Sequence, residues 1–279
     1  GVIAEQRALP AAKGMVGDRH RNGHVDADHA DFDLGGKLAR RIAVAGEDLG
    51  AVGIFVAVNE INGDIMVWFH PEGAPPAWEV PEVPELNDEN WSTPQYWEFT
   101  VPNHVQNIAE NTCDPEHFQY VHHNPETPYN EITIAEDGRV LTLYTKSEKI
   151  NPPQELWARM HNPGLAIVRT RYAENAEMLV YSTAQPTTLN ETHLRWTLAV
   201  RKEIVDFAGD EVMRAIKDGI FDDMPIWQHK VYRDKPVFCK ADTGLIGFRK
   251  WVKQFYVEDA DRSVAKAIPL RQAQANPID

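Results

Sequence analysis

Short segments in which apolar and polar residues alternate dominate the middle of the chain, and they constrain its fold more than any other feature. A first alternating segment covers residues 96–101, and Asn62-Gly63-Asp64 stands between two apolar runs, which indicates a hairpin. Later segments are separated by turn sequences about every dozen residues, as in an antiparallel meander. They occupy residues 131–134, 139–145, 165–172, 177–183 and 193–200.

Helical segments flank the alternating ones. Residues 104–123 have helical composition, residues 203–231 favour one long helix, and residues 248–255 favour a shorter last one. Because an antiparallel sheet must bury at least one face, this order predicts an α+β fold. In that fold a curved antiparallel sheet wraps around long helices, and a ligand cavity is expected between the sheet and the long helix.

Charge and composition exclude several classes of function. The 42 acidic and 28 basic residues give a net charge of -14, which argues against a nucleic-acid partner because such binding depends on lysine and arginine. No apolar run is long enough to cross a membrane and no secretory signal is visible, so a cytoplasmic location is expected. Only Cys113 and Cys239 are present, which excludes a disulfide framework and a four-cysteine metal site.

One segment gathers potential metal ligands. Asn111, Asp114, His117 and His122 lie within twelve residues. Two histidines five positions apart diverge by about 140° on a regular helix, so a local break is required to aim both at one ion. Pro115 and the Asn124-Pro125 pair favour such breaks. The alternative is that Asn111 and Asp114 are capping residues and the histidines are buried polar groups with backbone partners.

A carboxylate elsewhere in the chain is needed to complete a site. Two imidazoles and one carboxylate form the three-ligand face that leaves open positions on Fe(II). Asp222 and Asp223 interrupt an amphipathic helix among bulky apolar residues, and a buried carboxylate needs a compensating charge. The alternative is that both aspartates are solvated.

These two segments together resemble a known family. Glu110-Asn111-x-x-Asp114-x-x-His117-x4-His122 resembles the mononuclear-iron motif of Rieske-type non-haem iron oxygenase α subunits. The segment 66–76 looks like the strand and loop that lead out of the Rieske domain of that family. The segments 223–236 and 248–256 are similar to the branch that includes 3-ketosteroid 9α-hydroxylase oxygenases and cholesterol 7-desaturases.

The resemblance implies roles for individual residues. By position, His117, His122 and Asp223 are iron ligands in a helix-grip type catalytic domain, with Asp222 as the fallback carboxylate. Asp114 matches the aspartate that bridges the iron ligand to a Rieske-cluster histidine of the neighbouring subunit. Asn111 matches a polar residue near the iron.

The chain departs from the family pattern at the Rieske cluster, which needs two cysteines and two histidines. No cysteine precedes Cys113. Residues 1–45 are therefore expected to be a degenerate or truncated Rieske-domain remnant or linker, and residues 46–279 the mononuclear iron domain. Electrons are expected from an external Rieske [2Fe–2S] centre on a separate reductase or ferredoxin. The resemblance also implies a homo- or hetero-oligomer, such as a trimer.

The expected function is O2-dependent hydroxylation or oxidative demethylation of an apolar or aromatic small molecule at Fe(II). Two alternatives remain open at this point. One is a zinc hydrolase, with Glu116 or His123 as general base beside a zinc-bound water. The other is a non-catalytic or structural subunit of a hetero-oligomeric oxygenase.

Overall fold

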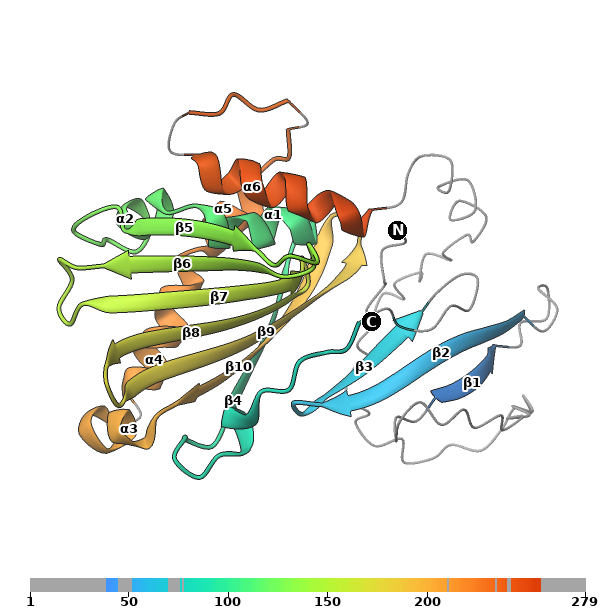
Figure 1. The fold of residues 1–279 in the computed structure, drawn as a ribbon, viewed down its shortest axis with the longest axis horizontal. Coiled ribbons are helices and arrows are strands. Elements are labelled where there is room, and N and C mark those ends of the chain that lie inside the picture. Colours follow the sequence, from blue (N-terminus) through green and yellow to red (C-terminus); the bar gives the residue numbers. More distant parts are fainter. Residues whose placement is uncertain are drawn as a thin grey trace, which may run out of the picture.

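The computed structural model contains two antiparallel sheets and a set of helices that cover one face of the larger sheet (Figure 1). It describes residues 39–44, 52–69, 76, 78–209, 211–233, 235–239 and 242–256. The smaller sheet has the order β1-β2-β3, with β1 at Ala39–Val44, β2 at Val52–Ile61 and β3 at Asp64–Phe69. The larger sheet has the order β4-β10-β9-β8-β7-β6-β5. Its strands are β4 Gln95–Val101, β5 Tyr129–Ile134, β6 Leu141–Ser147, β7 Gln154–Asn162, β8 Leu165–Ala173, β9 Ala176–Thr188 and β10 Glu191–Val200.

The larger sheet follows directly from the alternation in the sequence. In β6 the residues at every second position, from Leu141 to Ser147, are buried and those between them are half-buried. The register places Leu143 opposite Ala158, which in turn lies opposite Val168, so that one face of the sheet collects small and branched apolar side chains. The predicted α+β class with a curved antiparallel sheet is confirmed.

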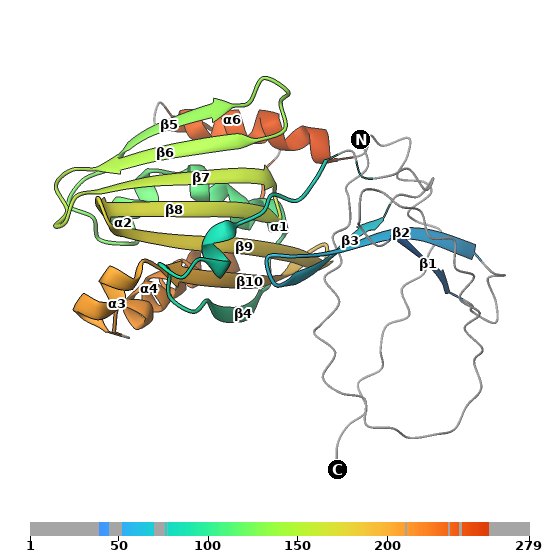
Figure 2. The same cartoon turned by 60° about the horizontal axis from the view of Figure 1, so that its bottom comes forward.

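Helices cover one face of this sheet and an extended segment covers the other. Met213 of α4 (Glu211–Phe221) packs on Val180 and Leu198. Side chains that point to the opposite face of the sheet pack against Val83 and Trp91 of the segment 78–94. Figure 2 shows this segment crossing the strands. This segment includes the 3-10 turn η1 (Pro84–Asn87). Side chains on both faces of the central strands β8, β9 and β10 are therefore buried.

Short helices replace the long ones that the sequence predicts. The segment 104–123 divides into α1 (Val105–Ala109), the 3-10 turn η2 (Glu110–Cys113) and α2 (Glu116–Tyr120). The prediction of one helix over 203–231 is wrong, because α3 (Lys202–Ala208) ends at Gly209 with φ +60 and a two-residue turn separates α4 from α5 (Met224–His229). The last helix, α6 (Thr243–Val252), packs against β5 and η2 and is followed by η4 (Lys253–Phe255).

The predicted hairpin is present, and its turn joins the small sheet to the large one. Asn62 and Gly63 both have positive φ, as a two-residue turn between twisted strands requires. The Asn62 side chain donates to the Pro81 carbonyl and accepts from the Val83 amide, and Asp64 lies 3.3 Å from the Arg195 guanidinium of β10. The hairpin tip is thus tied to both the covering segment and the sheet.

The predicted division of the chain at residues 45 and 46 stays a prediction. Residues 1–38, with the histidines at 20, 24 and 29, lie outside the described residues. The boundary itself falls between β1 and β2, which pair in one sheet. Among the described residues, no helix combines the length and apolar character needed to span a membrane.

Candidate metal centre

The two motif histidines come from α2 and from the point where this helix ends. His117 lies in the first turn of the helix and is buried. The amides of Val121 and His122 both donate to the His117 carbonyl, and His123 adopts a positive φ, so the regular helix stops before His122. This break brings the rings of His117 and His122 to a centroid distance of 5.2 Å, with an interplanar angle of 74°.

The carboxylate comes from the turn between α4 and α5. Asp223 is only 6% exposed, whereas the adjacent Asp222 is exposed. One carboxylate oxygen of Asp223 lies 3.5 Å from His122 Nε2. The other is buried and has no hydrogen-bond partner among the described residues. Burying a carboxylate oxygen without a partner is costly, so this side chain calls for a cation at the same place.

His117, His122 and Asp223 form a group whose ligand atoms all lie within 4.8 Å of one another. Nitrogen and oxygen ligands bind a first-row divalent ion at about 2.0 to 2.2 Å, so small rotations of these side chains would close the group around one ion. Two imidazoles and one carboxylate occupy one face of such an ion and leave the opposite face open. The donor set therefore fits a mononuclear iron centre.

The surroundings of His117 keep its ring neutral and fix its orientation. Burial lowers the pKa of His117, although the Asp223 charge acts in the opposite direction. Its Nδ1 hydrogen-bonds to the Asp114 carbonyl oxygen. Because a carbonyl oxygen only accepts, Nδ1 carries the proton and Nε2 keeps its lone pair for an ion. Phe118 packs near both imidazoles, with centroid distances of 4.2 Å to His117 and 5.9 Å to His122.

The other two residues of the predicted site lie in the segment that leads into α2. Asp114 is half-buried, and its side chain accepts the Glu116 amide at 3.1 Å while its backbone carbonyl holds the imidazole. The orienting contact thus comes from the main chain of Asp114 rather than from its carboxylate. Asn111 lies in η2, half-buried, and its carbonyl accepts the Asp114 amide at 3.1 Å.

Of the two candidate general bases for a zinc hydrolase, one is hydrogen-bonded to a threonine and the other is exposed. The Glu116 carboxylate accepts a hydrogen bond of 2.9 Å from the Thr127 hydroxyl. His123 is exposed, and its positive φ turns the chain away from α2. Neither residue belongs to the group of ligand atoms.

A buried ion network that the sequence does not reveal supports the centre. Glu110 is 1% exposed and lies in η2. One of its oxygens accepts from Arg249 at 2.7 Å, and the other accepts from Lys230 at 3.1 Å and from Arg249 at 3.2 Å. Burial alone would raise the pKa of Glu110, but the Arg249 hydrogen bond and the Lys230 charge outweigh it and lower this pKa. The network ties η2 to the end of α5 and to α6.

Asn103 is a second residue that sequence reasoning misses. Its side-chain amide donates to the carbonyls of Trp227 and Lys230 at 2.5 and 2.7 Å, and thereby caps the end of α5. Its oxygen accepts from the amide of His104 and the side chain of Asn107. An asparagine side chain offers two donors and two acceptor positions, and all four are used. Since Asp223 precedes α5, Asn103 helps to fix the helix that positions the carboxylate.

Comparisons with known proteins show the family to which the chain belongs. Residues 67–256 match the model of the 3-ketosteroid 9α-hydroxylase C-terminal domain family. The chain is 25% identical over 223 residues to the 3-ketosteroid-9-alpha-monooxygenase oxygenase component of Mycobacterium tuberculosis, covering 72% of this chain and 57% of the relative. It is 26% identical over 250 residues to the cholesterol 7-desaturase of Caenorhabditis elegans, covering 77% and 57%. The chain thus spans about 57% of the length of these relatives.

Solved structures share the fold. NdmA of Pseudomonas putida CBB5 with caffeine matches with a TM-score of 0.60 and 16% identity, covering 75% of this chain and 64% of that chain. Dicamba monooxygenase bound to dicamba matches with a TM-score of 0.58 and 16% identity, covering 75% and 70%. The curved sheet with helices on one face is therefore shared with proteins of very different sequence.

Proposed function

The chain belongs to the 3-ketosteroid 9α-hydroxylase C-terminal domain family of Rieske oxygenases, and from this premise we propose that it is the catalytic part of an O2-dependent oxygenase. The observation that carries the proposal is the convergence of His117, His122 and Asp223, which come from segments about 100 residues apart. One buried oxygen of Asp223 has no hydrogen-bond partner in the described part of the chain, and this supports the proposal, because a carboxylate that merely accepted protein hydrogen bonds would show them.

In this proposal the three side chains hold one Fe(II), through Nε2 of His117, a ring nitrogen of His122 and the Asp223 carboxylate. The bound iron supplies O2 activation for attack on a C–H bond. The residues of the chain orient and shield the centre. The Asp114 carbonyl fixes the His117 ring, and Phe118 limits the access of water to both imidazoles.

Electrons are proposed to come from a Rieske [2Fe–2S] centre that these 279 residues do not contain, on a reductase or ferredoxin. A Rieske centre needs two thiolates, and the only two cysteines are Cys113, which is fully buried, and Cys239 in the segment before α6. Burial raises the pKa of the Cys113 thiol to about 12, which disfavours the thiolate that a cluster requires. Asp114, next to the His117 ligand, is the proposed bridge for the incoming electron, with Asn111 nearby.

The proposed substrate is an apolar or aromatic small molecule, and the reaction is a hydroxylation or an oxidative demethylation. The relatives are named for steroid substrates and two structural neighbours contain caffeine or dicamba, so these compounds form the first test panel. The proposed assembly is a homo- or hetero-oligomer such as a trimer.

The metal site is tested with pairs of neighbouring variants. Protein loaded with Fe(II) without air and then desalted should retain about one iron per chain. Asp223→Ala and His122→Ala should lose most of this iron, because each removes a ligand. The controls Asp222→Ala and His123→Ala replace an exposed aspartate and an exposed histidine next to the proposed ligands, and they should retain the iron. Equal retention in all four variants, or no iron in the unaltered protein, would contradict the proposed ligand set.

The activity is tested by O2 consumption with a Rieske-containing reductase and each panel compound. We expect consumption that depends on iron, donor and substrate, together with a hydroxylated or demethylated product. An iron-loaded protein that consumes no O2 with any donor and compound would favour a non-catalytic subunit. Product formation in air-free buffer would instead favour a hydrolase.

A further inference from the structure

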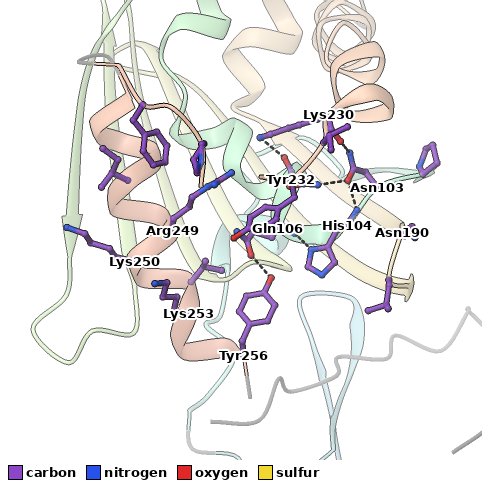
Figure 3. Close-up of a pocket in the computed structure, with 18 residues that line it drawn as sticks. Asn103, His104, Gln106, Asn190, Lys230, Tyr232, Arg249, Lys250, Lys253 and Tyr256 are labelled. Atoms are coloured by element: carbon purple, nitrogen blue, oxygen red, sulfur yellow. Dashed lines mark hydrogen bonds between the residues drawn. The ribbon is translucent and has the colours of Figure 1, made fainter. Parts of the chain in front are cut away.

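A cleft of about 940 Å³ lies between α6, residues 230–232 and 236–238, and the turn that leads into α1 (Figure 3). Four cationic side chains line it: Lys230, Arg249, Lys250 and Lys253. Among the described residues that line it, none is acidic. In a chain with a net charge of -14 this concentration of positive charge is unusual, and it favours a negatively charged partner.

Part of this positive charge is free to act on a partner. Lys230 and Arg249 share the buried Glu110, so these three groups carry one net positive charge. Lys250 and Lys253 are exposed and make no ion pair with the described part of the chain. Lys250 lies in the last turn of α6 and Lys253 directly after this helix, and Figure 3 draws both among the residues that line the cleft. The wall of the cleft therefore presents a net positive surface.

Exposed apolar side chains surround these cations. Leu189, Val231, Tyr232 and Phe238 line the cleft, and Val237 beside it is fully exposed. The Arg249 guanidinium lies 4.7 Å from the Tyr232 ring centre and 5.7 Å from that of Phe238. Aromatic residues and arginine are enriched in protein interfaces, and clustered exposed apolar residues mark binding surfaces. This composition fits a protein partner better than a small anion.

The cleft shares one helix with the metal centre. Asp223 precedes α5 and Lys230 follows it, and six helical residues span about 9 Å. Asn103 lines the cleft and donates to the Trp227 carbonyl at 2.5 Å, while the Trp227 amide donates to the Asp223 carbonyl at 3.0 Å. A short series of hydrogen bonds therefore connects the cleft to Asp223, a proposed iron ligand.

Helix α6 joins the cleft to the turn that holds Asp114. At its start, a Cβ on Gly244 would stand 2.6 Å from the Cys113 carbonyl oxygen, which shows how closely α6 approaches that turn. At its other end, Lys250 and Lys253 border the cleft. A standard interface covers about 800 Å² per partner, which is wide enough to extend along the roughly 15 Å of this helix.

We propose that this cleft is the docking surface for an acidic electron carrier with a Rieske [2Fe–2S] centre. The proposal rests on the oxygenase function proposed above. In the step that docking serves, the reduced [2Fe–2S] cluster of the carrier would lose one electron and the metal centre would gain it, with no transfer of atoms. The lysines steer the acidic carrier to the cleft, and the apolar rim contacts it after the charges have brought the two proteins together.

The test measures binding without turnover, with an acidic Rieske-type [2Fe–2S] ferredoxin as the probe. The double variant Lys250→Glu and Lys253→Glu reverses two exposed charges on the cleft. The control Lys202→Glu and Arg214→Glu makes the same change in net charge on α3 and α4, where both side chains are exposed. Binding is measured by titration calorimetry at low and at moderate ionic strength.

We expect the cleft variant to weaken ferredoxin binding by at least about tenfold at low ionic strength, and the control by less than about twofold. Binding to the unaltered chain should weaken with added salt. Failure of ferredoxin to bind at low ionic strength, or equal weakening by both variants, would overturn the proposal. So would a dimer of the chain that the cleft variant abolishes, because a second copy would then occupy the cleft.

Iron retention separates this proposal from the proposed function. The cleft variant leaves His117, His122 and Asp223 unchanged, so it should retain iron like the unaltered chain. Loss of ferredoxin binding with retained iron supports the docking surface by itself. If the unaltered chain binds ferredoxin at the cleft but never consumes O2, the oxygenase proposal fails and the docking surface remains.

Discussion

Replacing Glu110 with glutamine tests whether the buried ion network holds the catalytic part together. The two Glu110 oxygens accept hydrogen bonds from Gln106, Lys230 and Arg249. A glutamine at this position keeps the shape but replaces one oxygen with an NH2 group. Whichever way the amide turns, that group faces two donors, so two contacts become repulsive.

The expected cost follows from the burial of the network. Removing one partner of a buried ion pair costs about 3 to 5 kcal/mol. The side chains of Lys230 and Arg249 remain 25% and 17% exposed, and each keeps a second acceptor, the carbonyls of Asn107 and Arg233. Because these contacts and some water soften the loss, we expect about 3 kcal/mol, at the low end of the range.

The free energy of unfolding in urea measures this cost. A loss of about 3 kcal/mol should lower the melting temperature by about 6 to 12 °C in a domain of this size. The control is Glu155→Gln, which removes an exposed pair with Arg171 and should cost about 1 kcal/mol or less. A Glu110→Gln protein as stable as the Glu155→Gln protein would refute the structural role of the network.

The same variant should change the dependence of stability on pH. The pKa of Glu110 is lower in the folded chain than its usual value of 4.5. The stabilisation that this shift provides is therefore complete above about pH 4.5 and is lost as the pH falls through the folded pKa. Glu110→Gln should lose less stability than the unaltered chain in this acidic window. Parallel pH profiles would contradict the assigned role of the carboxylate.

Three further predictions follow from local geometry. Gly244→Ala should destabilise the chain by about 1 to 3 kcal/mol in thermal unfolding, because its Cβ would stand 2.6 Å from the Cys113 carbonyl oxygen. In its control, Gly247→Ala, the nearest atom to the new Cβ lies at 3.9 Å, so that variant should be neutral or stabilising. Asn103→Ala should cost about 2 to 3 kcal/mol in urea unfolding, because it leaves buried carbonyls at the end of α5 without donors. His161, whose pKa burial lowers to about 4, should show no ring titration between pH 8 and 5 by NMR.

The strands could be predicted because their signals are local. Alternation and turn residues fix β5, β6, β8, β9 and β10 to within a few residues. Strand β7 is not among the predicted strands, because charged and polar residues such as Glu155 and Arg159 interrupt the alternation of apolar and polar residues along it. The helix expected over 203–231 failed because an amphipathic pattern does not show where a turn interrupts it. Gly209 was the one local signal for the first break.

The site was predicted less completely, because its parts are joined only by tertiary contacts. The spacing of His117 and His122 required a break in the helix, and α2 ends at Tyr120, between the two histidines and four residues before Asn124. The choice of Asp223 over Asp222 depended on the resemblance, because the two aspartates are adjacent and the local sequence does not show which carboxylate is buried. Glu110 and its partners are separated by about 120 to 140 residues, and no local pattern connects them.

If His117, His122 and Asp223 hold iron as proposed, their placement couples iron binding to folding. An ion held by His122 and Asp223 would join two points about 100 residues apart in the sequence. Since only the folded chain brings these donors together, the ion also stabilises that state by mass action. Supply of iron during synthesis would then govern how much intact protein a cell accumulates, apart from any effect on turnover.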